Sequence, residues 1–275
     1  MTPADHSTWS NLAADMGPAE RHALSRREPM SVFAVISWGC AATGWVARVL
    51  NSHPDIFCMH AANVFWQKYG YPESERLDGV AYLRVVFTMA NSYLAAGDVH
   101  GISRHHVPAI RDAFGDHFRC AVLVRDPLPR IRSQLALFEA FRQFPAWDLE
   151  YIKETIDRHG IILPSEDPQD AMFVHAANML NAIVEEQELG AVFRSEDITS
   201  SPDALADFIN VLTNGKVCLD RDWLEQAVRQ PRVSQHADDN SEWELDPWQF
   251  DALRKVVWPE AWEAYEKLGY ANPLR

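Results

Sequence analysis

The feature that most constrains the fold lies near the start of the chain, where an apolar stretch leads through small residues into a helix. Residues 31–37 are apolar and β-branched, which is typical of a strand buried in a parallel sheet. Residues 38–44 are mostly small, and 45–50 have the composition of a helix that stops before Pro54. This order favours phosphate binding, because a loop of small residues lets an anion approach the backbone amides at the helix start.

The loop differs from the Walker motif of ATP-binding proteins, because no lysine precedes Thr43. Two interpretations of the loop alone stay open. It is a phosphate-binding loop, or it is a tight turn that simply joins a strand to a helix.

Strands and helices alternate along the rest of the chain. The strongest apolar run, 118–124, predicts a second buried strand, and shorter strands are predicted near 99–103 and at 190–193. Helices are predicted at 79–96, 109–114, 128–144, 171–189, from 201 onward and at 246–268. The alternation predicts an α/β fold: a three-layer P-loop-type domain with a central, mainly parallel sheet flanked by helices.

The length of 275 residues suits one domain or two small ones. We expect a polar N-terminal lead-in over 1–30 and a single domain over 31–275. Residues near 145–170 are rich in proline, acidic residues and turn formers, which indicates a variable insertion. Tryptophans crowd the C-terminal helical segment, which indicates core or lid packing, or the roof of an apolar acceptor pocket.

The chain is acidic, because 25 lysines and arginines stand against 39 aspartates and glutamates, a net charge of −14. This charge argues against a nucleic-acid partner and against an anionic membrane surface. No apolar run reaches the roughly 18 residues of a transmembrane helix, and the first residues lack the apolar core of a signal peptide. The four cysteines have no paired spacing, which predicts reduced thiols and no zinc site. We therefore expect a cytoplasmic protein.

A second candidate site follows the strand predicted at 118–124. Arg125 stands at the carboxyl end of this strand, where α/β folds bind ligands, and Ser133 follows eight residues later. A guanidinium and a hydroxyl can share one phosphate. The alternative is that Arg125 pairs with Asp126 or a neighbouring helix end, and that Ser133 is solvated.

A third candidate site lies at 104–108, just past the strand predicted near 99–103. His106 is the type of side chain that accepts a proton near neutral pH, and Arg104 can stabilise charge on a leaving group. The alternative is a structural histidine held by hydrogen bonds. The adjacent histidines lack the Cys, His or carboxylate spacing of a metal site.

In this order the three motifs resemble those of the PAPS-dependent sulfotransferases, where PAPS is 3′-phosphoadenosine 5′-phosphosulfate. That family has a P-K/R-S-G-T-T-W loop, then K-T-H-x-P, then V-R-N/D-P with a serine eight residues past the arginine. The corresponding stretches here are 40–45, 104–108, and 124–127 with Ser133. An acidic turn at 195–198 matches a further family feature, and the resemblance covers roughly residues 31–212.

The resemblance implies a site for PAPS as co-substrate, with no metal. Arg125 and Ser133 would hold the 3′-phosphate, and Ser195 would lie near the adenine. The loop would hold the 5′-phosphosulfate, with the backbone amides of its last three residues as donors. The loop residues of this site are Cys40, Ala41, Ala42, Thr43, Gly44 and Trp45.

The resemblance also implies the catalytic residues. His106 would deprotonate the acceptor hydroxyl, and Arg104 would stabilise the departing phosphate. A second branch of the family, which acts on glycans, uses a glutamate soon after the first helix. Ala62 stands at that position, and His60 lies nearby. His60 is therefore the second choice for the base, and a packed histidine at a strand end is its alternative.

Two departures from the family pattern leave other functions open. Cys40 replaces the basic residue of the loop, and the family's R-K-G segment is absent, so Arg229 or Arg232 is the candidate substitute at the 3′-phosphate. The alternatives are a non-catalytic nucleotide-binding or partner-binding descendant of the fold, and an ATP-dependent phosphotransferase. For the enzyme, the net charge favours a small or medium-sized acceptor that is neutral or weakly charged. The sequence predicts no oligomeric state.

Overall fold

A computed structural model describes residues 31–61, 78–90, 92–141, 146–231 and 244–275. These residues form two compact units. Of the described residues, the sheet unit contains 31–37, 42–61, 78–90, 92–124 and 189–231, and the helical unit contains 38–41, 125–141, 146–188 and 244–275. The single domain expected over 31–275 stays a prediction.

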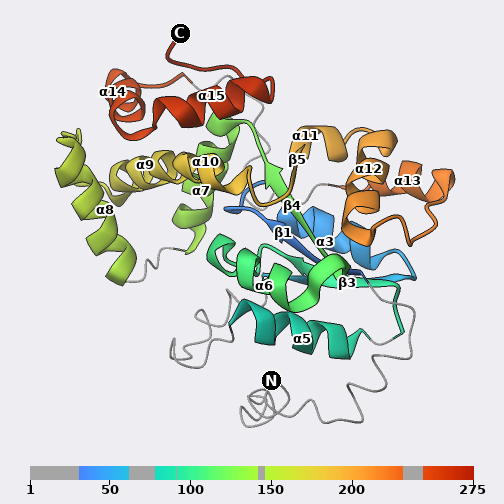
Figure 1. Cartoon of the computed structure of the whole chain (residues 1–275). Coiled ribbons are helices and arrows are strands. Elements are labelled where there is room, and N and C mark those ends of the chain that lie inside the picture. Colours follow the sequence, from blue (N-terminus) through green and yellow to red (C-terminus); the bar gives the residue numbers. More distant parts are fainter. Residues whose placement is uncertain (1–30, 62–77, 91, 142–145, 232–243) are drawn as a thin grey trace. The chain divides into compact units, whose positions relative to one another are not determined.

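The sheet unit is built on a five-stranded sheet (Figure 1). The strands are β1 (Ser31–Ile36), β2 (Ile56–His60), β3 (Ala95–Val99), β4 (Phe118–Val124) and β5 (Ala191–Arg194). Their order across the sheet is β2-β3-β1-β4-β5, and every neighbouring pair is parallel. The carboxyl end of β1 therefore lies between the carboxyl ends of β3 and β4. The predicted α/β class with a central parallel sheet is confirmed.

Helices cover both faces of this sheet. Those described are α3 (Thr43–Asn51), α5 (Gly79–Met89), α6 (Val107–Phe114), α11 (Ser195–Ile198), α12 (Pro202–Thr213) and α13 (Arg221–Val228), with the 3₁₀ turns η3 (Arg104–His106) and η4 (Gly115–His117). α3 lies on one face and α5 and α6 on the other, as right-handed crossovers require (Figure 1). α12, which follows the last strand, packs on β1 and β4. Ser31 Oγ donates to the Leu212 carbonyl of α12 at 3.0 Å, which fixes that helix against β1. The predicted three layers are present in this unit.

A buried carboxylate holds the carboxyl end of β3. The side chain of Asp98 has no exposed surface, and it accepts hydrogen bonds from the Tyr82 hydroxyl of α5 and from the backbone N–H of Gly101. Burial and the neighbouring carboxylate raise the pKa of Tyr82, so its hydroxyl stays a donor. A β-carbon at Gly101 would overlap the Asp98 carboxylate, so this close approach requires glycine. The network fixes the turn that follows β3.

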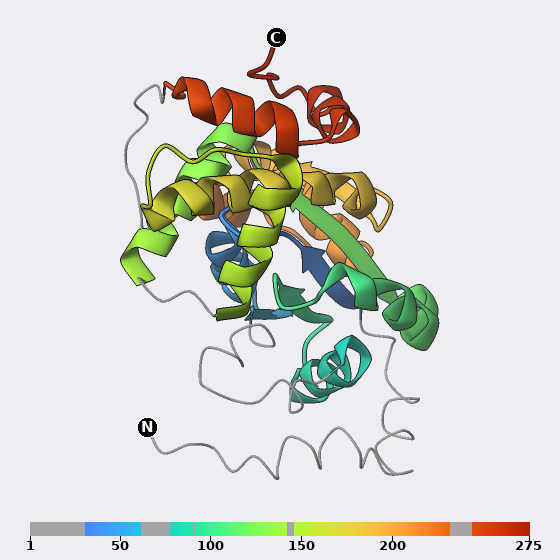
Figure 2. The same ribbon diagram turned by 90° about the vertical axis from the view of Figure 1, so that its left-hand side faces the viewer.

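The helical unit is organised around α9 and α10 (Figure 2). Its described helices are α7 (Pro127–Phe141), α8 (Ala146–His159), α9 (Pro168–Asn178), α10 (Ile183–Glu186), α14 (Pro247–Val256) and α15 (Pro259–Lys267), with the 3₁₀ turn η5 (Met179–Ala182). α9 contacts α7, α8 and α14, and α15 packs on α10. Asn181 of η5 donates to the Val256 carbonyl at 2.9 Å and accepts from the Trp258 N–H at 2.8 Å. The C-terminal helices are thus tied to η5.

The two most apolar predicted strands, 31–37 and 118–124, are confirmed as β1 and β4. The strand predicted near 99–103 is wrong: β3 ends at Val99, because the preceding helix stops at Met89 and leaves room for an earlier strand. β2 was not predicted from the apolar pattern, and only the alternative interpretation of His60 implied a strand end there.

The stretch near 145–170 forms α8 and the start of α9, and the Trp-rich segment forms α14 and α15. The lead-in over 1–30 lies outside the described residues. None of the described helices is long and apolar enough to span a membrane.

Replacing Tyr82 by phenylalanine removes one donor to the buried Asp98 carboxylate. Because a buried charge that loses a donor is costly, we expect the free energy of unfolding to fall by about 1–3 kcal/mol, measured by urea unfolding. The control is Tyr151→Phe on α8, where an exposed hydroxyl accepts from Asn178 and its loss should cost less than about 0.5 kcal/mol. Unchanged stability of Tyr82→Phe would contradict the role given to this network.

Candidate functional site

The loop after β1 has an unusual backbone. Gly39, Cys40 and Ala42 all have positive φ, at 83°, 55° and 60°, a region that residues other than glycine rarely adopt. Ala42 is the N-cap of α3 and has no side-chain group that could cap the helix. The first amides of α3, at Thr43, Gly44 and Trp45, thus open the helix at its positive end. Such a helix start can bind an anion.

Two side chains of α3 hydrogen-bond to the backbone of the segment that follows α13. The Trp45 indole Nε1 donates to the Gln230 carbonyl at 3.2 Å, and Arg48 Nη2 donates to the Pro231 carbonyl at 3.0 Å. Arg232, expected at the 3′-phosphate, is the next residue in the sequence and lies outside the described residues.

His60 lies against the start of α3. Its Nε2 is 3.2 Å from Thr43 Oγ1, and a β-carbon at Gly44 would lie 3.6 Å from the ring Cε1. Partial desolvation lowers the pKa of His60 below 6.5, although part of the side chain is exposed. The ring is therefore mainly neutral at pH 7 and can accept a proton. The structure brings together His60 and the two loop residues that the sequence named separately.

His100 is a candidate that the sequence analysis missed. It directly follows β3, has a φ of 69°, and its Nδ1 hydrogen-bonds to the Ser37 carbonyl at the end of β1. Because a carbonyl only accepts, Nδ1 carries the proton and Nε2 is the basic nitrogen of the neutral ring. The signal was obscured because a strand placed near 99–103 puts His100 inside the strand rather than at its end.

Arg104 and His106 form most of η3, between β3 and α6. Arg104 is half-buried, and the side chain of His106 lies against Gly79, the first residue of α5, where a β-carbon would overlap it. His106 thus packs beside the start of α5, whereas His60 packs beside the start of α3.

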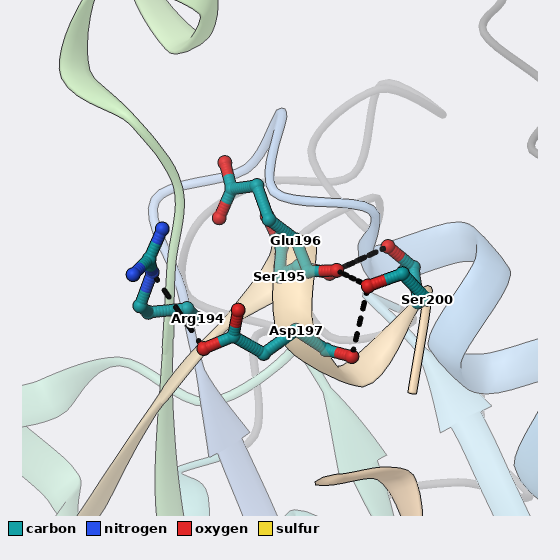
Figure 3. Close-up of polar contacts among 6 residues, drawn as sticks. Arg194, Ser195, Glu196, Asp197 and Ser200 are labelled. Carbon is teal, nitrogen blue, oxygen red and sulfur yellow. Dashed lines mark hydrogen bonds and ion pairs between the residues drawn. The ribbon is translucent and has the colours of Figure 1, made fainter. Parts of the chain in front are cut away.

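An ion pair and hydrogen bonds between neighbouring residues hold the acidic turn after β5 together (Figure 3). Ser195 is buried and opens α11. Arg194 Nε lies 3.7 Å from Asp197 Oδ2, and Ser200 Oγ donates to the Glu196 carbonyl at 2.6 Å. Because the strands are parallel, the turn lies at the same edge of the sheet as His60 and His100. The contact of Ser195 with adenine stays a prediction.

In the helical unit, Cys40 is enclosed by the second predicted pair. Arg125 Nη1 donates to the Cys40 carbonyl at 2.9 Å, and Ser133 hydrogen-bonds to the Cys40 thiol. Burial raises the pKa of this thiol, and the Ser133 hydroxyl, Arg130 and Arg125 offset only part of the rise. Cys40 is therefore a neutral thiol surrounded by donors. Asp126 Oδ1 accepts from the Leu128 N–H at the start of α7 at 3.2 Å.

Among the described residues, no three His, Cys, Asp or Glu side chains are grouped as a metal site.

No protein-family model matches the chain, and no curated protein is significantly similar to it. Among solved structures, the chain is similar to a sulfotransferase from Alicyclobacillus acidocaldarius, with 15% sequence identity, 90% of this chain and 98% of that chain covered, and a TM-score of 0.47. A likeness this distant assigns no function.

Proposed function

We propose that the protein is a sulfotransferase that moves the sulfuryl group of PAPS to the hydroxyl, or the amine, of a small or medium-sized acceptor. One observation carries the proposal. Arg125, 85 residues from the loop in sequence, donates to Cys40 of that loop, and Ser133 contacts the same cysteine. The two residues that the family motif pairs are therefore joined to the loop that the family motif places before them.

The donor nucleotide offers two anionic groups, and the chain offers two sets of donors. In the sheet unit, the amides of Thr43, Gly44 and Trp45 suit the 5′-phosphosulfate, because they open α3 without a side-chain cap. In the helical unit, Arg125 and Ser133 suit the 3′-phosphate. A guanidinium has five donor N–H groups, so Arg125 can bond the Cys40 carbonyl and still bind phosphate oxygens.

Transfer needs a base at the acceptor and charge stabilisation at the leaving group. His60 is our choice for the base, because its ring is neutral and lies beside the amides that would bind the phosphosulfate. It takes the proton of the acceptor hydroxyl while the oxygen forms a bond to sulfur. The bond between sulfur and the bridging phosphate oxygen breaks, and adenosine 3′,5′-bisphosphate leaves with that electron pair. Arg104 is the candidate to stabilise the leaving phosphate.

His106, the base that the family motif implies, stays a prediction, and His100 is a third histidine with a basic Nε2 at the same edge of the sheet. The net charge of −14 favours an acceptor that is neutral or weakly charged. A cytoplasmic location without nucleic-acid or membrane partners belongs to the same proposal.

The donor assignment predicts that the 3′-phosphate dominates nucleotide affinity. By isothermal titration calorimetry, we expect adenosine 3′,5′-bisphosphate to bind at least about tenfold more tightly than adenosine 5′-phosphate. Arg125→Met should weaken the bisphosphate about 10- to 100-fold and leave the monophosphate unchanged. The control is Arg158→Met on α8, an exposed arginine paired with Glu154.

Three results would contradict this assignment. Equal affinities for the two nucleotides would remove the 3′-phosphate site. Magnesium-dependent ATP turnover would favour the phosphotransferase. A folded protein that binds neither nucleotide would favour the partner-binding descendant.

The base assignment predicts a loss of turnover without a loss of binding. His60→Gln should slow the conversion of PAPS to the bisphosphate with a panel of phenols and alcohols by about 10²- to 10⁴-fold, at nearly unchanged bisphosphate affinity. In the wild type, activity should fall only as the pH drops through a value below 6.5, because the lowered pKa keeps the base unprotonated above it. His105→Gln, at an exposed neighbour, is the control. Full turnover of His60→Gln with loss in His106→Gln would assign the base to His106.

A further inference from the structure

Arg130 is a buried guanidinium with an unused donor. It lies on α7, between Arg125 and Ser133 in the sequence. Its side chain is only 5% exposed, and it hydrogen-bonds to the Tyr265 hydroxyl of α15. Among the described residues, its Nη2 is buried and has no hydrogen-bond partner. A buried guanidinium nitrogen without an acceptor is costly, so this atom calls for a partner that the chain itself does not supply, such as an anion or a water.

Three side chains that interact with Arg130, those of His175, Tyr265 and Cys40, are neutral at pH 7. Burial, helped by Arg130, lowers the pKa of His175 to about 4. Burial raises the pKa of Tyr265, an effect that Glu186 increases and Arg130 reduces, so this hydroxyl stays protonated. The raised pKa of Cys40 keeps its thiol protonated as well. Glu186 is itself buried on α10 and is the carboxylate that acts on Tyr265.

The unused donor belongs to the same cluster as the predicted phosphate ligands. Arg130 and Ser133 are three residues apart on α7, which places them on one face of the helix. Arg130 and Arg125 both lower the pKa of the Cys40 thiol through their charge, and Ser133 hydrogen-bonds to that thiol. Two guanidiniums and a hydroxyl thus surround one residue of the loop.

We propose that Arg130 is a specificity-determining ligand of the nucleotide 3′-phosphate, which it binds through Nη2 together with Arg125 and Ser133. The assignment rests on the proposed function, because it takes PAPS as the ligand. A phosphomonoester carries close to two negative charges and three terminal oxygens, which two guanidiniums and one hydroxyl can satisfy. A monophosphate nucleotide leaves the buried Nη2 of Arg130 without an anion. The cluster therefore selects nucleotides with a 3′-phosphate over those without one.

Calorimetry on the full chain tests this assignment, with adenosine 3′,5′-bisphosphate and adenosine 5′-phosphate as probes. Arg130→Gln should weaken the bisphosphate about 10- to 100-fold and change the monophosphate less than about twofold. Tyr265→Phe is the control, because it removes the hydrogen-bond partner of Arg130 but leaves the guanidinium. This variant should keep the preference for the bisphosphate. Thermal unfolding of each variant shows that it is folded.

Two outcomes are distinguishable. Arg130→Gln that keeps the full wild-type preference would overturn the role of Arg130 and leave the proposed function standing. A wild type without any preference would overturn both. If Arg130→Gln does not fold, Arg130→Lys replaces it: one ammonium cannot reproduce the fork that serves Tyr265 and a phosphate together. The preference of the folded lysine variant should fall at least threefold, and an unchanged preference would overturn the assignment.

Discussion

The hydrogen bond from Arg125 to the Cys40 carbonyl holds the backbone of the loop that follows β1, and the proposed phosphate site depends on this loop. Cys40 and Ala42 both have left-handed backbone conformations, which cost about 1–3 kcal/mol each for residues other than glycine. Such strain persists only where neighbouring contacts enforce it. In the helical unit, Arg125 holds the carbonyl and Ser133 the thiol of Cys40, and in the sheet unit Val46 N–H bonds the Ala42 carbonyl at 3.0 Å. The strained backbone delivers the uncapped start of α3.

This arrangement changes the meaning of Cys40. The residue stands where the family pattern has a basic side chain, and a neutral thiol cannot replace that charge. Positive charge is instead gathered around the thiol by Arg125 and Arg130, on either side of the start of α7. The overall charge of −14 is thus compatible with a local cationic cluster, since water and salt screen exposed carboxylates more strongly than the buried guanidinium of Arg130.

The sequence predicted those parts of the fold that local patterns determine. β1 and β4 are buried on both faces, so they appear in the sequence as apolar runs. β3 does not, because its residues include Gly97, packed under Phe33 of β1, and Asp98, whose partners Tyr82 and Gly101 come from elsewhere in the fold. The missed strand hid His100 in turn, because a residue is recognisable at a strand end only when that end is known.

The same limit applies to the candidate site. Arg125 and Ser133 were predicted from their spacing within one strand and helix, which is local information. The surroundings of Arg130 depend on Tyr265 of α15, which is 135 positions away in the sequence and hydrogen-bonds to the guanidinium. No periodicity of α7 distinguishes a guanidinium that meets a hydroxyl and a thiol from one that points into solvent.

A crystal structure of the protein with adenosine 3′,5′-bisphosphate tests the central claim most directly. We expect the 5′-phosphate within hydrogen-bond distance of the backbone amides of Thr43, Gly44 and Trp45, and the 3′-phosphate on Arg125 and Ser133. A nucleotide bound away from these amides, or bound with its 3′-phosphate in solvent, would contradict it.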